Sequence, residues 1–560
     1  MKNNVTSNSA LLFFFLALFA FVYVPGLLVP LMDNDSAHHA LIGFNMYSSG
    51  NYAYLLDLGI PYLDKPHLLF WLSALAYHIL GVTTLAYKIP SLIFTVLSVY
   101  STYRLGKLLY GAAAGRLAAM ILSTSCAIVL ANNDVRMEAL LTGGIIFSIW
   151  QLCEYIHGRK SVNLILAALG LALGFSTKGM IGVVIPAVTV FIHLVYQRNW
   201  KMVFHWKWLI LVLLFGVFVS PVLYAYYLQY DLHPETVVRG RSHISGLKFI
   251  LWNQNMERIK GEGHSQTKKD FFFFFHTFFW TFLPWSLLSV LSVGSRLKRA
   301  VQTRFAYKPG TELLTVGGVT FFMIFFSMSS FKLPHYLTCL FPLFSILLAG
   351  YLNEREHDQS RVKLFWNIQL YSVILIVLVA ALLNMWVFPL HKMTAGLTLL
   401  LLVSVWLLVL FSRRPLYAKT VRFTLSGALL IFASLNLNFY PQLLSYQAGN
   451  ELATVSERLK LDPKRVYYFQ AGDYSFSYDF YTRFQHKEIS IQDIKAMQTK
   501  NAPVWLFTSA EGKKVLEENG FPVSTTFQNK DYRVSILKPK FLNPATRGET
   551  LTTVYLIKLF

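Results

Sequence analysis

The chain has 560 residues, of which 55% are hydrophobic and only 14% are charged, and its mean hydropathy is +0.46. Because soluble proteins carry about 25% charged residues, this composition excludes an ordinary soluble protein and predicts a polytopic α-helical membrane protein. The net charge of +22 indicates basic cytoplasmic loops and contacts with anionic membrane lipids, and no nucleic-acid partner is predicted.

The first apolar run, 10–31, is not followed by a small-residue cleavage site, so we expect an uncleaved first membrane helix. With about 20 residues needed per span, this run and the later ones predict about thirteen transmembrane helices. The later runs are 84–110, 112–131, 138–157, 162–177, 179–197, 208–229, 272–293, 312–330, 334–352, 364–388, 392–412 and 421–440. The run 67–81 is shorter and is expected to lie along the membrane interface.

The distribution of Lys and Arg predicts the orientation of these helices. If the N-terminus is cytoplasmic, alternate connections are cytoplasmic and should carry the basic residues. Six of them do, with Arg104, Arg159, Lys201, Arg296, Arg361 and Arg413 among their cations. The same parity places loops 32–83 and 230–270, Lys178 and the turn 332–335 on the outer face.

The outer loop 32–83 opens with Asp33 and Asp35 and contains Asp64 and Lys65 directly before Pro66. An ionisable residue at the membrane boundary costs about 2.5–3.5 kcal/mol on insertion scales, so a cluster of them indicates a functional site. Burial would raise the pKa of Asp35, whereas a nearby Lys65 would lower it. We therefore expect Lys65 to be the partner that keeps Asp35 ionised.

The stretch NNDVRMEALLT places Asp134 and Glu138 four residues apart, which on a helix puts both on one face. Such a pair repels unless a cation lies between them, and Arg136, Lys65 or a divalent metal could supply that charge. No glycine-rich phosphate-binding loop occurs in a context that would support nucleotide binding, so no nucleotide cofactor is predicted.

The outer loop 230–270 is unusually basic for an extracytoplasmic loop. Its cations are Arg239, Arg241, Lys248, Arg258, Lys260, Lys268 and Lys269. One explanation is an anionic ligand such as a phosphate, and the other is a solvated loop with incidental charge. The turn after Lys332 adds His335 as a candidate phosphate contact.

Hydrophobicity falls after residue 444, which ends the predicted transmembrane domain 1–444. The segments KRVYYF and PVWLFTS are typical of buried strands, and STTFQNKDYRVSIL is predicted to form a closing pair of strands. We therefore expect a small extracytoplasmic α/β domain over 445–540, followed by a C-terminal tail, 541–560.

The motifs of the membrane portion occur in a familiar order. After the D-x-D come SGNY, YLDKPHLLFW, DVRMEALLT, STKGMIGVVIP, WNQNMERIKGEGH, FFWTFLPW and FKLPHYLTCLFP. Together they resemble the bacterial GT-C-type glycosyltransferases related to the lipid A aminoarabinose transferases and protein O-mannosyltransferases. The resemblance implies a GT-C-like fold in the bacterial inner membrane. It also implies a polyprenyl-phosphate-linked sugar donor and a lipid, glycan or protein acceptor. The odd number of spans and the six basic loops predict that the C-terminal domain is periplasmic.

The resemblance also implies roles for single residues. Asp35 takes the position of the key carboxylate and Asp33 completes the D-x-D, with Glu138 as a further catalytic acid. The implied substrate-binding residues are Lys65, Lys178, Arg258 and His264. His335 and Asp134, in the predicted outer segments, are further substrate-binding candidates. The sequence departs from the family pattern at Ser36, where a glutamate is common, at Glu138, where Asp is commoner, and at His67, where a second proline is usual.

These residue types suit glycosyl transfer. Fixed cations stabilise the negative charge that develops on a departing phosphate. A carboxylate near the sugar C1 can steady oxocarbenium charge or take a proton from an acceptor hydroxyl, whereas a phosphate acceptor needs no strong base. The sequence leaves these alternatives open. A zinc, magnesium or manganese ion held by Asp64 and His264, or by the D-x-D, is a further hypothesis.

Other function classes stay open. A secondary transporter or flippase of an anionic or lipid-linked substrate is the main alternative, although such proteins usually show internal repeats and interrupted helices at mid-membrane. An oligosaccharide ligase or polymerase and a sensor with an external ligand-binding domain are the others.

Overall fold

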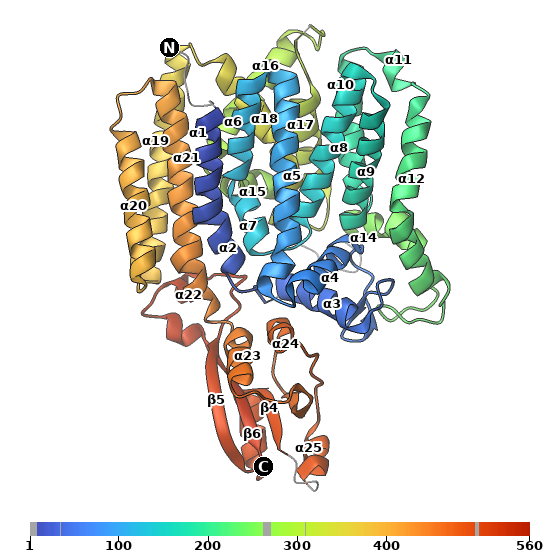
Figure 1. The fold of residues 1–560 in the computed structure, drawn as a ribbon, viewed down its shortest axis with the longest axis vertical. Coiled ribbons are helices and arrows are strands. Elements are labelled where there is room, and N and C mark those ends of the chain that lie inside the picture. The colour runs from blue at the N-terminus through green and yellow to red at the C-terminus, as the bar shows by residue number, and fades with distance from the viewer. Residues whose placement is uncertain (1–7, 34, 261–269, 309, 499–502) are drawn as a thin grey trace.

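The computed structural model describes residues 8–33, 35–260, 270–308, 310–498 and 503–560. A bundle of long helices forms one end of the molecule and a small sheet domain forms the other (Figure 1). The first half of the bundle contains α1 (Asn8–Leu18), η2 (Phe19–Tyr23), α2 (Val24–Leu28), α3 (Asp35–Ser49), β1 (Leu56–Asp57), β2 (Ile60–Pro61), α4 (Leu68–Leu80), α5 (Thr84–Tyr110), α6 (Ala112–Ser123), α7 (Cys126–Asn133), α8 (Glu138–Gly158), α9 (Ser161–Lys178), α10 (Ile181–Tyr196), α11 (Trp200–Val203) and α12 (Lys207–Tyr226).

The second half of the bundle continues after residue 226. It contains η3 (Tyr227–Asp231), α13 (Gly246–Lys248), η4 (Phe249–Asn253), α14 (Gln254–Lys260), α15 (Phe273–Thr281), α16 (Ser286–Gln302), α17 (Leu314–Met328), η5 (Pro334–Leu340), α18 (Phe341–Glu354), α19 (Gln359–Leu382), η6 (Leu383–Val387), α20 (Met393–Leu410), α21 (Leu416–Ser434), η7 (Leu435–Phe439) and α22 (Tyr440–Leu444).

The bundle has the dimensions of a membrane domain. Among the described residues, eight helices are long and apolar enough to cross a bilayer, or nine if α6 and α7, which meet at a bend of 51°, form one span. Shorter apolar helices include α4, α10 and α17. The chain is therefore a multi-pass membrane protein, and the figure of about thirteen spans stays a prediction.

The charged outer segments predicted from the sequence gather at one end of the bundle. Helices α3, α4 and α14 lie across the end that faces the sheet domain, whereas α11 and the end of α16 lie at the opposite end (Figure 1). Those opposite segments carry Lys201, Arg296 and Arg299, as the parity of the loops predicts. One end of the apolar bundle thus carries the predicted outer segments with their charged residues, and the other end carries the basic segments.

Close packing of α8, α9 and α10 fixes where two of these helices end. A Cβ on Gly144 would lie 2.7 Å from the backbone N of Gly174, and one on Gly182 would lie 2.2 Å from the backbone C of Gly174. Only residues without side chains allow helix backbones to approach so closely. Lys178 is the last residue of α9 and Glu138 is the first residue of the antiparallel α8. The two side chains therefore meet at the same end of the bundle.

The C-terminal domain contains α23 (Ala448–Arg458), η8 (Pro463–Arg465), β3 (Val466–Phe469), α24 (Phe476–Thr482), α25 (Ile491–Gln498), β4 (Val504–Ser509), α26 (Ala510–Glu518), β5 (Val523–Asp531), α27 (Pro539–Leu542), η9 (Arg547–Thr550) and β6 (Thr552–Leu559). The strand order in the sheet is β3-β4-β6-β5, with β3 and β4 parallel and the other pairs antiparallel.

The sheet corrects two predictions at the C-terminus. The segment 541–560 is not a tail, because it contains β6, whose apolar side chains Leu556, Ile557 and Leu559 are fully buried between β4 and β5. The stretch STTFQNKDYRVSIL does not form a pair of strands, because it supplies only β5, which pairs with β6. Two threonines, a tyrosine and a lysine within β6 diluted its hydrophobicity and hid the strand.

Candidate functional site

Asp35 begins helix α3 at the end of the bundle nearest the sheet domain. Its Oδ2 accepts a hydrogen bond of 2.8 Å from Nη1 of Arg136. Arg136 also binds Asp134, whose Oδ2 lies 2.9 Å from Nε and 2.8 Å from Nη2 of the same guanidinium. The side chain of Asp35 is 40% exposed, so one carboxylate of this trio is accessible to a substrate while the arginine holds it in place.

The charges around Asp35 decide its protonation. Burial alone would raise the pKa of Asp35, but Arg136, His39, Lys65 and His335 together lower it below its ordinary value. Among these groups Arg136 has the largest effect, and Lys65 contributes less. Arg136, and not Lys65 as predicted, is therefore the main partner that keeps Asp35 ionised.

A second acid–base cluster lies at the ends of α8 and α9. Nζ of Lys178 donates a hydrogen bond of 2.7 Å to Oε1 of Glu138, and Nε2 of His335 lies 3.5 Å from the same oxygen. The Lys178 ammonium also lies 4.4 Å from the centroid of the Tyr336 ring. Both members of the pair are buried, with exposed fractions of 5% for Lys178 and 6% for Glu138.

The predicted pairing of Asp134 with Glu138 on one helix face is wrong. Asp134 is the C-cap of α7, whereas Glu138 opens α8, so a turn separates them. Each acid has its own cation, because Arg136 binds Asp134 and Lys178 binds Glu138. The turn between α7 and α8 directs the two carboxylates into adjacent clusters.

Asp33 turns away from these clusters and toward the C-terminal domain. Its carboxylate accepts hydrogen bonds from the hydroxyl groups of Ser475 and Ser477, at 2.8 and 2.9 Å, and from the backbone N–H of Ser477 at 3.2 Å. These donors lie at the start of helix α24. The two acids of the D-x-D therefore contact different parts of the molecule: Asp35 binds the bundle and Asp33 binds the sheet domain.

The basic loop partly lies outside the described residues, and so does the predicted ligand His264. Arg258 lies on α14. Asp64 forms an ion pair with Arg239, which also binds Glu257 at 3.0 Å. Among the described residues no group of three or more His, Cys, Asp or Glu side chains is arranged to hold a metal ion.

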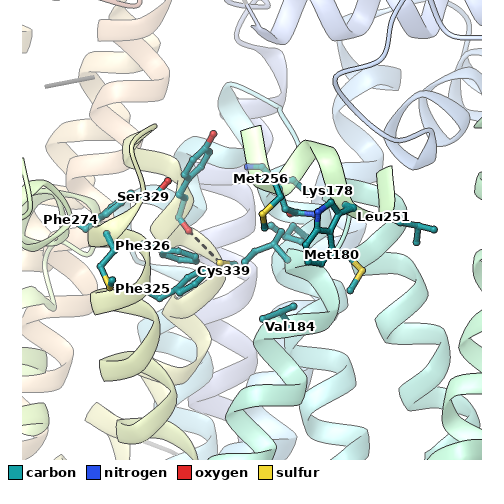
Figure 2. Close-up of a pocket in the computed structure, with 16 residues that line it drawn as sticks. Lys178, Met180, Val184, Leu251, Met256, Phe274, Phe325, Phe326, Ser329 and Cys339 are labelled. Carbon is teal, nitrogen blue, oxygen red and sulfur yellow. Dashed lines mark hydrogen bonds between the residues drawn. The ribbon is translucent and has the colours of Figure 1, made fainter. Parts of the chain in front are cut away.

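An apolar cavity of about 450 Å³ adjoins the second cluster. Figure 2 shows Lys178 beside Met180, Leu251 and Met256 on one side, with Phe325 and Phe326 on the other. Among the described residues that line it, Lys178 is the only one with a charged side chain. The cavity therefore combines an apolar wall, suited to a hydrocarbon chain, with a single cation at the polar end of the bundle.

Some members of this site had no clear signal in the sequence. Leu251 and Trp252 of η4, Phe274 of α15 and Phe325 of α17 line the cavity, although each occurs in an ordinary apolar run. Lys332 had a signal, since it stands alone in an outer turn, and its Nζ donates to the carbonyl oxygen of Asp270 at 2.6 Å. Tyr336 lies four residues after Lys332, in η5.

Comparison with known proteins finds sugar transferases among the proteins similar to this chain. Residues 64–225 match the family model described as dolichyl-phosphate-mannose-protein mannosyltransferase. An undecaprenyl phosphate-alpha-4-amino-4-deoxy-L-arabinose arabinosyl transferase from Proteus mirabilis is 27% identical over 362 residues, which are 63% of this chain and 61% of that protein. An uncharacterized protein from Aquifex aeolicus is 25% identical over 456 residues, 80% of this chain and 82% of that one.

The chain spans about six tenths of the length of the arabinosyl transferases that it matches in sequence. In structure the likeness of fold extends over nearly the whole chain. The crystal structure of ArnT from Cupriavidus metallidurans bound to undecaprenyl phosphate superposes with a TM-score of 0.72 and 15% identity, covering 98% of both chains. The predicted GT-C-type fold and the predicted resemblance to the aminoarabinose transferases are therefore confirmed.

Proposed function

We propose that this chain is a membrane glycosyltransferase that moves a sugar from a polyprenyl-phosphate donor to an acceptor on the outer face of the bacterial inner membrane. The acceptor class is lipid A or another envelope lipid, a glycan or a protein. The observation that carries the proposal is the apolar cavity with Lys178 in its wall, at the same end of the bundle as the accessible carboxylate of Asp35. Similarity to the arabinosyl transferases supports the same reaction class.

The cavity supports a donor with a long hydrocarbon chain and an anionic head group. Methionine and phenylalanine side chains provide an adaptable apolar wall. Lys178 donates only one of its three N–H groups to Glu138, which leaves donors for a phosphate oxygen. We assign Lys65, Arg258, His264 and His335 to the same phosphate, as further cationic or hydrogen-bonding groups of the outer loops.

The reaction breaks the bond between the sugar C1 and the donor phosphate oxygen and forms a bond between C1 and an acceptor oxygen. The electron pair of the broken bond stays on the phosphate, whose growing negative charge Lys65 and Lys178 stabilise. If the acceptor is a hydroxyl group, its proton goes to Asp35, and Arg136 holds that carboxylate in its ionised form. A phosphate acceptor arrives already ionised, and Asp35 then orients the sugar and stabilises positive charge at C1.

The remaining predicted acids receive different roles. We propose that Glu138 fixes Lys178 and that Asp134 fixes Arg136, because each is bonded to that cation. A divalent metal at Asp64 and His264 stays a hypothesis, and Asp64 is engaged by Arg239. Transfer measured before and after treatment with EDTA, with zinc, magnesium or manganese added back, tests it. A rate that EDTA leaves unchanged would reject a metal requirement.

We further propose that the C-terminal domain, from about residue 445 to the end of β6, lies in the periplasm. The support is that basic segments occupy the opposite end of the bundle (Figure 1). A reporter enzyme fused after Phe560 that is active only outside the cytoplasm should be active. A fusion active only in the cytoplasm would contradict this orientation.

Sealed vesicles containing the purified protein test the function itself. They are incubated with a radiolabelled polyprenyl-phosphate monosaccharide and envelope lipid. Label should move covalently to the acceptor lipid, and vesicles without protein give the background. If the labelled donor crosses the vesicle membrane unchanged and no acceptor becomes labelled, the protein is a flippase and the proposal is wrong.

A further inference from the structure

The short segment that leads into Asp35 is fastened to the C-terminal domain, more than 400 residues away in the chain. The backbone N–H of Leu31 donates to the hydroxyl of Tyr481 at 2.9 Å, and the carbonyl of Leu31 accepts from Nε2 of Gln447 at 3.0 Å. Oε1 of the same Gln447 accepts from the backbone N–H of Asp33 at 2.8 Å. One glutamine thus bridges two backbone groups of this segment.

The side chain of Asp33 completes the attachment. Its two oxygens accept three hydrogen bonds from Ser475 and Ser477, at the first turn of α24, so a carboxylate of the membrane domain satisfies donors of a C-terminal helix. Carboxylate acceptors make hydrogen bonds that are stronger than those between neutral groups. These three hydrogen bonds therefore attach Asp33 to the C-terminal domain more strongly than three bonds between neutral groups would.

The other end of the segment is fixed within the bundle. Lys88 on α5 is fully buried, and its Nζ donates to the carbonyl oxygens of Gly26 at 3.0 Å and Val29 at 2.7 Å. These carbonyls lie at the C-terminal end of α2, where a cation is favourable. The backbone from Val29 to Asp33 is thus held by α5 on one side and by the C-terminal domain on the other.

Helix α24 also contacts α3 directly beyond the segment. The ring of Phe476 stacks on the ring of His38 with 4.2 Å between centroids, and Nε2 of His38 lies 2.9 Å from Oδ2 of Asp57. Phe480 is buried in the same apolar cluster as Leu31 and Ala37. The first turns of α3, which begin with Asp35, therefore pack on a helix of the C-terminal domain.

We propose that the C-terminal domain is a positioning device for Asp35, acting through Asp33, Gln447 and Tyr481, and that Asp33 is a positioning residue and not a catalytic one. This inference rests on the proposed transferase function. The physical reason is that a misplacement of a reacting group by about 1 Å can reduce a rate by about a hundredfold. By holding the segment that precedes Asp35, the domain fixes the position of Asp35 relative to Arg136 and to the donor sugar.

Two variants and two matched controls test this role. Asp33→Asn and Gln447→Ala remove bonds to the segment. Gln442→Ala removes hydrogen bonds of the same kind, to the carbonyls of Phe388 and Pro389, and touches neither Asp33 nor Asp35. Asp473→Asn removes an exposed carboxylate two residues before Ser475. The measurements are kcat per folded molecule, KM for the donor, and amide hydrogen exchange of residues 31–37.

We expect Asp33→Asn and Gln447→Ala to lower kcat by about tenfold or more, with donor KM changed by less than about twofold. Amide exchange over 31–37 should increase, while β4 and β6 exchange at the parent rate. Both controls should keep the parent kcat. A purely structural attachment would instead lower the thermal midpoint equally in Gln447→Ala and Gln442→Ala at unchanged kcat, and that result would overturn the inference.

The outcome for the parent protein separates this inference from the function on which it rests. A parent protein that transfers no sugar contradicts the proposed function. An active parent protein together with a fully active Asp33→Asn variant contradicts only the positioning role. If the substitutions at Asp33 and Gln447 prevent folding, Ser477→Ala is measured instead, because it removes one hydroxyl and keeps the backbone N–H bond to Asp33. Parent-like kcat with parent-like exchange in that variant would also overturn the proposal.

Discussion

The two carboxylate clusters at the end of the bundle that faces the sheet domain differ in their access to solvent. Glu138 and Lys178 are nearly fully buried against each other, whereas Asp35 is 40% exposed and its partner Arg136 is 23% exposed. A buried ion pair holds its geometry but leaves its acid no freedom to take a proton from a substrate. The comparison indicates that Glu138 fixes a cation, while Asp35 acts on the reacting sugar.

Breaking the buried pair should have the largest effect on stability. Lys178→Met leaves the Glu138 carboxylate buried without its main partner, which typically costs about 3–5 kcal/mol. The double variant Lys178→Met/Glu138→Leu replaces the pair by apolar groups and should recover most of the lost thermal stability. Thermal unfolding in detergent measures both. If the double variant unfolds as readily as the single one, the pair is not the buried unit described here.

The activity of the same double variant separates the role of the pair in stability from the role of Lys178 in donor binding. It should regain stability without regaining transfer, because it lacks the Lys178 cation that we assign to the donor phosphate. Full transfer activity in the stable double variant would show that Lys178 does not bind the donor.

Removing the outer cation Lys65 should have a smaller effect, expressed in donor use. Lys65→Ala removes a charged hydrogen bond to the phosphate, worth about 1.5–3 kcal/mol in kcat/KM for the donor. Its thermal midpoint should stay close to that of the parent protein, because Lys65 is partly exposed. Steady-state kinetics with increasing donor concentration measure the change. A variant that uses the donor at the parent rate would remove Lys65 from the phosphate site.

The smallest expected change is a shift in the pH profile. Arg136 gives the largest contribution that lowers the pKa of Asp35, so in Arg136→Gln burial dominates and the pKa of Asp35 rises. The carboxylate then becomes protonated at a higher pH, and the acid limb of kcat/KM should move to higher pH. Lys363→Gln, at an exposed cation of α19, is the control. An acid limb that stays in place would contradict the assignment of that limb to Asp35.

The sequence predicted the apolar runs and the charged end of the bundle because both depend on local composition. The runs 84–110 and 138–157 coincide closely with α5 and α8. The parity of the basic loops placed Asp35, Lys65 and Lys178 at the same end, where the structure also has them. The D-x-D and R-x-E motifs pointed to Asp35 and Glu138, one acid of each cluster, before the geometry was known.

The sequence could not predict which partner each acid would have. Asp33 and Asp35 look equivalent in a D-x-D, but the partners of Asp33 lie at Ser475 and Ser477, in a domain to which no motif pointed. The four-residue spacing of Asp134 and Glu138 suggested one helix, and the end of α7 at Asn133 separated them. The partner of each acid depends on long-range contacts and on where a helix ends, and local residue spacing predicts neither.

The most direct test of the central claim is the transfer rate of the Asp35→Asn variant, measured per folded and membrane-inserted molecule. The substitution keeps the shape of the side chain and removes its charge, and loss of an acid–base group lowers rates by about 10²–10⁴-fold. We predict a loss of that size with a thermal midpoint close to that of the parent protein, since a partly exposed ion pair contributes little to stability. Near-normal transfer by the folded variant would contradict the assignment of Asp35 as the catalytic carboxylate.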